Sequence, residues 1–129
     1  MTILMNKVLA LKMLYENISK QVVPVKLAYK FTKLFTPILA EAEFYSKEMN
    51  KILDECGEKD KNGNLKVNAE GTSVRIKEDC TETLSKKLKE LESIEVELKD
   101  ITFTIEELNE LKLSVGEFNL LMPFITDEE

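Results

Sequence analysis

The sequence predicts a mainly α fold, a helical bundle or hairpin built on one long central helix over about residues 24–56. Apolar residues recur every three or four positions along that segment, as on one face of a helix. Only four Gly and three Pro interrupt 129 residues, which favours long helices over many short strands. A chain of this length is expected to form one domain, residues 1–129.

A first helix is expected within residues 1–21, with Thr2 as its cap. Its apolar side chains are three or four positions apart and would share one face. They are Leu4, Val8, Leu11, Tyr15, Ile18 and Val22. Pro24 should end this run and open the next helix, because proline is tolerated in a first helical turn.

The long helix has the clearest pattern in the chain. Its apolar stripe is heptad-like and consists of Leu27, Phe31, Leu34, Ile38, Ala42, Tyr45, Met49, Ile52 and Cys56. Pro37 removes one backbone hydrogen bond and should bend the helix. Gly57 is a suitable stop.

Residues 58–77 are expected to form a turn and a small β-hairpin at the tip of the helical hairpin. Asn62-Gly63 indicates a tight turn. Apolar and polar residues alternate in 65–67 and 74–76, which predicts the two arms of a hairpin over about 65–76.

A third helix is expected over about 78–93, antiparallel to the end of the long helix. Residues 94–129 should hold a short strand and short C-terminal helices. Thr104 is expected to cap one of them, with Glu107 completing a capping box, and Ser114 to cap another. An apolar latch is expected from Phe118, Leu121, Met122 and Phe124.

The charge is unevenly distributed. Residues 1–40 hold six lysines against Glu16 alone, a net charge of +5, so the rest carries −11 of the total of −6. A basic first third is suited to an anionic partner. The alternative is that it packs beside the acidic remainder of this chain or of a second copy.

Composition argues against several kinds of chemistry. The chain has no histidine, which is the commonest general acid/base and zinc ligand. Cys56 and Cys80 are too few for a disulfide framework, and Cys80 is expected to be a small core residue. Neither a signal peptide nor a membrane-spanning segment is expected, and a cytoplasmic location follows. No catalytic, cofactor-binding or metal-binding residue is predicted, and the protein is not expected to be an enzyme.

The order of several short motifs resembles a known family. These are Val23-Pro24-Val25-Lys26-Leu27-Ala28-Tyr29-Lys30, Lys59-Asp60-Lys61-Asn62-Gly63, the 84–97 segment ending in Glu95-Val96-Glu97, Ile105-Glu106-Glu107-Leu108, and Leu121-Met122-Pro123-Phe124-Ile125. Over about residues 4–125 the chain is similar to small uncharacterised proteins of tailed phages and prophages of low-GC Gram-positive hosts. Relatives tend to have an acidic residue before Pro123, where this chain has Met122. The resemblance implies a phage origin and no particular activity.

The leading hypothesis is a non-enzymatic phage protein that binds a protein partner in the host cytoplasm or in the virion. Contacts are expected from residues 23–35 and from the hairpin region 61–76. The predicted partner-binding residues are Lys26, Tyr29, Lys30, Lys33 and Arg75. A homodimer and a monomer are both open, whereas the single arginine argues against nucleic acid. The alternative is an inhibitor of a host protein such as a defence nuclease, acting through the acidic surface 78–100.

Overall fold

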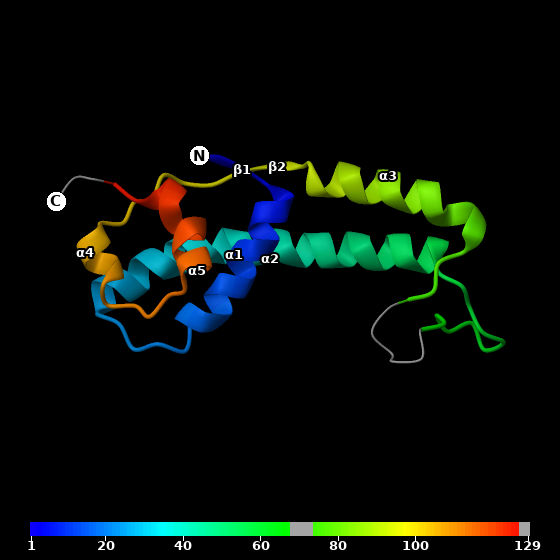
Figure 1. Ribbon diagram of the computed structural model, residues 1–129, viewed down its shortest axis with the longest axis horizontal. Coiled ribbons are helices and arrows are strands. Elements are labelled where there is room, and N and C mark those ends of the chain that lie inside the picture. Colours follow the sequence, from blue (N-terminus) through cyan, green and yellow to red (C-terminus); the bar gives the residue numbers. More distant parts are fainter. Residues whose placement is uncertain (68–73, 127–129) are drawn as a thin grey trace. The chain divides into compact units, whose positions relative to one another are not determined.

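The computed structural model describes residues 1–67 and 74–126, and it is mainly helical, as predicted (Figure 1). The chain divides into two compact units, one formed by Met1–Ala42 with Glu95–Glu129 and the other by Glu43–Ile94. The long helix α2 (Val25–Cys56) contributes to both. It begins after Pro24 and runs to the residue before Gly57, close to the predicted bounds. The prediction of a single domain is not tested by these units and stays a prediction.

The first unit combines short strands with helices from both ends of the chain. Besides the start of α2 it contains β1 (Thr2–Leu4), α1 (Met5–Ile18), β2 (Glu95–Glu97), α4 (Ile105–Leu108), α5 (Val115–Leu121) and the 3₁₀ helix η2 (Met122–Phe124). The two strands pair antiparallel, with Ile3 opposite Val96. They lie side by side in Figure 1 although they come from distant parts of the sequence.

This pairing corrects the prediction for the first helix. Thr2 does not cap α1 but lies in β1, and the N-cap is Leu4, whose side chain makes no capping hydrogen bond. The strand extends the backbone before the helix begins, which leaves Leu4 43% exposed. The helix ends at Ile18, so Val22 falls in the following loop and is 99% exposed instead of buried.

Aromatic side chains fill much of the core of this unit. Phe103 is fully buried and stacks on Phe31 with ring centroids 4.7 Å apart. Phe31 also meets Phe35 at 6.0 Å, and Phe35 meets Tyr15 of α1 at 5.1 Å. This chain of rings fixes α1 and the segment before α4 onto the same face of α2.

Both predicted C-terminal caps are confirmed. The Thr104 side chain accepts a hydrogen bond from the Glu107 N–H, and the Glu107 side chain accepts one from the Thr104 N–H. Ser114 and Glu117 form the same capping box at α5. The predicted latch is right for Leu121 and Phe124, which are buried, and wrong for Met122, which is 52% exposed.

The second unit contains the end of α2, the 3₁₀ helix η1 (Glu78–Cys80) and α3 (Thr81–Glu92). Between α2 and η1, three extended segments around Glu58, Lys66 and Arg75 are joined by backbone hydrogen bonds. The Glu58 N–H donates to Arg75 O, the Arg75 N–H to Lys66 O, and the Lys66 N–H to Glu58 O, so that the three residues form a closed, hydrogen-bonded ring. The predicted hairpin arms do pair, through an antiparallel bridge between Val67 and Val74. The turn expected between them, residues 68–73, lies outside the described residues.

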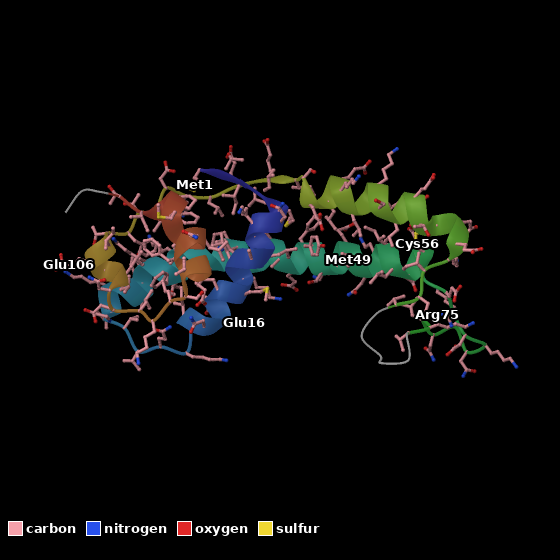
Figure 2. The ribbon with its side chains drawn as sticks, in the orientation of Figure 1. Met1, Glu16, Met49, Cys56, Arg75 and Glu106 are labelled. Carbon is pink, nitrogen blue, oxygen red and sulfur yellow. A yellow bond between two sulfur atoms is a disulfide. The ribbon has the colours of Figure 1, made fainter. Side chains whose placement is uncertain are left out.

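A disulfide between Cys56 and Cys80 joins the end of α2 to η1, with Cα atoms 5.4 Å apart (Figure 2). Cys56 is buried, whereas Cys80 is half-buried. The sequence predicted that Cys80 is a small core residue, and this was wrong, because Cys80 is half-buried and bonded to Cys56.

Candidate protein-binding surface

The predicted binding residues of the first unit lie on the first turns of α2. The helix is anchored there because the Ala28 N–H donates to Pro24 O at 3.0 Å. At about 100° per residue, Lys30 lies roughly 60° from the direction of buried Leu27. By the same rule Lys26, Tyr29 and Lys33 lie about 100° or more from it. Lys30 therefore borders the core, and the other three face outward.

Lys30 is held inside its own unit. Its ammonium donates to Glu107 Oε1 at 2.9 Å and to Thr102 O at 3.0 Å, and it lies 5.6 Å from the centroid of the Phe103 ring. Partial burial would raise the pKa of Glu107. Hydrogen bonds from Lys30 and the Thr104 N–H, together with the Lys30 charge, outweigh that effect and lower the pKa. This lysine ties the C-terminal segment to α2, so its charge is not free for a partner.

Tyr29 and Lys33 form the centre of an exposed patch. The Lys33 ammonium lies 4.9 Å from the centroid of the Tyr29 ring, and Tyr29 is 60% exposed. Within the part of the chain that the structure describes, Lys26 and Lys33 make no ion pair. Their positive charge is thus not neutralised by the protein itself.

Two valines next to these residues are exposed to an unusual degree. Val22 is 99% and Val25 85% exposed. Val25 is four residues before Tyr29 and therefore on the same side of the helix. We call the set Val22, Val25, Lys26, Tyr29 and Lys33 the basic–aromatic patch. Sequence reasoning missed both valines. Val25 could have been found, because it lies four residues before Tyr29, which was predicted to be exposed for binding.

A hollow of about 260 Å³ lies beside the patch. Tyr29, Lys30 and Lys33 line it from α2, and Asp100, Ile101 and Thr102 line it from the segment after β2. The Asp100 carboxylate is 87% exposed. It also accepts a hydrogen bond from the Met1 ammonium at 3.1 Å. The hollow therefore offers a ligand the Lys33 ammonium and the Tyr29 ring, beside a carboxylate that is already paired.

Arg75 belongs to the second unit and is not brought together with the other predicted residues inside one unit. Its Nε lies 3.7 Å from Glu58 Oε2, and its backbone takes part in the hydrogen-bonded ring with Glu58 and Lys66. The guanidinium is 62% exposed. Arg75 is therefore exposed but already ion-paired with a residue of its own unit.

The acidic residues of the second unit alternate with lysines. The hollow between α3 and the end of α2 has a volume of about 470 Å³. Its charged lining consists of Glu48, Lys51, Glu55, Lys87 and Glu90. Lys87 Nζ lies 2.6 Å from Glu55 Oε2. This part of the surface is mixed in charge and not uniformly acidic.

The described residues offer neither a cluster of metal ligands nor a membrane-spanning helix. Among residues 1–67 and 74–126, no three His, Cys, Asp or Glu side chains are grouped so that they could hold a metal ion. Over the same residues, every helix is too short or too polar to cross a membrane. The predicted absence of catalytic, cofactor and metal sites stays a prediction.

Comparison with known proteins identified no relative of this chain. No protein-family model matches the chain, and no curated protein or solved structure is significantly similar to it.

Proposed function

We propose that the chain is a non-enzymatic, phage-encoded protein that binds another protein through the basic–aromatic patch, as an assembly factor, chaperone or accessory structural component. The observation that carries the proposal is the exposed Tyr29 under the Lys33 ammonium, beside two exposed valines. Tyrosine and apolar side chains are typical anchors of protein interfaces, and nearby unpaired charges steer the encounter.

The chemistry of the patch favours a protein with an acidic, partly apolar surface. Lys26 and Lys33 attract carboxylates, whereas Val22, Val25 and Tyr29 need apolar contacts. A nucleic acid is a poorer fit, because the chain has a net charge of −6 and one arginine. The phage origin rests on the motif resemblance. A homodimer and a monomer are both compatible with the proposal.

The test is a tagged pull-down from phage-infected and uninfected host cells, with mass spectrometry of the bound proteins. It compares the wild type with Lys26→Glu/Lys33→Glu, which removes the unpaired charges but keeps Lys30 for the fold. The matched control is Lys12→Glu/Lys20→Glu, which makes the same charge change at two exposed positions of the first unit.

The proposal expects phage head or tail components, captured by the wild type and the control and lost in Lys26→Glu/Lys33→Glu. Equal capture by all three proteins would remove the patch from the explanation. Capture of one host enzyme from uninfected cells would favour the inhibitor hypothesis instead. No specific contact supports that hypothesis, since the acidic segment 78–100 is divided between two units at Ile94.

A further inference from the structure

The first unit has a second surface feature, a groove along β1. It has a volume of about 350 Å³. Four consecutive residues of β1 and its approach line it, Met1 to Leu4, together with Lys7 and Leu11 of α1. Asn119, Leu120, Pro123 and Phe124 from α5 and η2 complete the lining. Neighbouring residues of a strand point to opposite faces. A groove that touches all four residues, and none of β2, therefore runs along the outer edge of β1.

The backbone of this edge has free hydrogen-bonding groups. Met1 and Leu98 exchange two hydrogen bonds, since the Leu98 N–H donates to Met1 O at 2.7 Å and the Met1 nitrogen donates to Leu98 O at 3.0 Å. In an antiparallel pair, hydrogen-bonded residues alternate with residues whose N–H and C=O point away from the partner. The register with Ile3 opposite Val96 therefore turns Thr2 and Leu4 outward.

The outward groups of Thr2 are not used by the rest of the chain. Within residues 1–67 and 74–126, neither its N–H nor its C=O has a hydrogen-bond partner, and the Leu4 N–H has none. The Leu4 C=O is different, because as the N-cap it faces the first turn of α1. One donor and one acceptor on Thr2 and one donor on Leu4 are spaced as an added strand would require.

The walls of the groove specify the side chains of such a strand. Leu11 and Phe124 are buried and form apolar parts of the lining, and Leu4 is 43% exposed. Two described lining residues carry a positive charge, Met1 at its N-terminal ammonium and Lys7 at its side chain. The Met1 ammonium is paired with Asp100 at 3.1 Å, whereas no described carboxylate pairs with Lys7. The lining thus suits a segment with apolar residues and one carboxylate.

We propose that the outer edge of β1 binds an extended segment of a partner protein, which adds to the sheet as a third strand. Apolar side chains of the segment fill the groove, and one of its acidic residues faces Lys7. Two strands of three residues each form a marginal sheet, and a third strand would stabilise it. The inference rests on the proposed protein-binding function but uses a surface other than the basic–aromatic patch.

A second copy of the chain is a less suitable occupant. If two copies paired through β1, the added strand would be Thr2-Ile3-Leu4, which has no carboxylate for Lys7. β2 does carry carboxylates, but it is already paired with β1 of its own copy. A segment of another protein is therefore the better occupant. Pairing with the acidic β2 strand of a second copy is an outcome that the experiment distinguishes.

The experiment selects binders to the whole wild-type chain from a library of random eight-residue peptides, and then measures the affinity of synthetic versions by fluorescence anisotropy. Thr2→Pro removes the outward N–H and keeps the hydrogen bonds to β2, because proline is tolerated at a strand edge. Thr2→Ala is the matched control and keeps that N–H. We expect peptides with alternating apolar residues and one Asp or Glu, and at least about fivefold weaker binding to Thr2→Pro.

A charge swap tests the same site independently of the strand. Lys7→Glu should weaken the acidic peptide several-fold, and a peptide with Lys in place of its acid should recover binding to that variant. If no peptide is enriched, or if enriched peptides bind equally to wild type, Thr2→Pro and Lys7→Glu, the proposal is refuted. If sedimentation shows self-association that Thr2→Pro abolishes, the occupant is a second copy and the proposal is wrong.

The basic–aromatic variant separates this inference from the proposed function. Lys26→Glu/Lys33→Glu should bind the selected peptides with unchanged affinity, since neither residue lines the groove. Loss of the cellular partner in that variant with unchanged peptide binding would support both proposals. Retained cellular binding with loss of peptide binding in Thr2→Pro would support the groove alone.

Discussion

The Lys30–Glu107 ion pair should stabilise the first unit by an amount that a double-mutant cycle can measure. Its N···O distance is 2.9 Å, with side chains 38% and 28% exposed. Fully exposed pairs contribute about 0.2–1 kcal/mol, whereas charge-assisted hydrogen bonds in buried sites contribute about 1.5–3 kcal/mol. With both side chains about one third exposed, we expect a coupling free energy of about 1 kcal/mol.

Each single variant should lower the free energy of unfolding by more than the coupling free energy of the pair. Lys30→Ala also loses the hydrogen bond to Thr102 O, and Glu107→Ala also loses the capping box with Thr104. Each extra loss is worth about 1 kcal/mol, so each single variant should lower the free energy of unfolding by about 2 kcal/mol. Lys26→Ala is the control, and its cost should stay within about 0.5 kcal/mol.

The assay is urea denaturation followed by circular dichroism for wild type, both single variants and the double variant, at low and high salt. Salt should reduce the coupling only partly, because partly buried pairs are screened less than exposed ones. A coupling below about 0.3 kcal/mol, the usual error of additivity, would refute the structural role of Lys30. The lysine would then return to the set of candidate partner contacts.

Four further outcomes follow from the described contacts. Phe103→Ala should destabilise the chain by about 3–5 kcal/mol, measured by urea denaturation, because it leaves a cavity beside Phe31. Gly57→Ala should lower the melting temperature, since a Cβ there would lie 2.6 Å from Leu53 O. The folded pKa of Glu107 is lowered. The stabilisation that ionised Glu107 gives the fold is therefore complete above its pKa in the unfolded chain, about 4.3. It is lost as the pH falls through the lower pKa of the folded state, and urea denaturation between pH 6 and 3 can follow this loss. Reduction of the Cys56–Cys80 disulfide, verified by thiol counting, should lower the free energy of unfolding by about 2–4 kcal/mol. An unchanged denaturation midpoint would show that the bond does not stabilise the fold.

Features set by neighbouring residues were predictable from the sequence. The stripe of α2 from Leu27 to Cys56 follows from helical periodicity, and the capping box of Thr104 and Glu107 follows from their spacing of three. Both depend on contacts within a turn or two of helix. The end of the helix at Gly57 is also a local feature. Distant contacts add a separate requirement for glycine at this position, because the side chains of Leu65 and Val74 approach it too closely for a Cβ.

Features set by distant residues were not predictable in the same way. Thr2 looks like a cap, but pairing with Glu97 takes its backbone into a strand. Nothing within the first twenty residues indicates that partner. The disulfide required knowing that η1 returns to the end of α2, and the spacing of Cys56 and Cys80 alone left this open. Lys30 was an intermediate case. It was predicted as a partner contact, and its angle from Leu27 on a helix could have shown that it borders the core but not that it pairs with Glu107.

The structure narrows the predicted binding residues by showing which charges the fold already uses. Lys30 is ion-paired with Glu107 in the first unit, and Arg75 is ion-paired with Glu58 in the second. Lys26 and Lys33 have no such partner among the described residues, and they stand beside apolar side chains that the fold leaves exposed. An experiment that reverses all the lysines of α2 would therefore mix unfolding with loss of binding. Reversing Lys26 and Lys33 alone separates the two effects, because neither contributes a hydrogen bond or an ion pair to the described fold.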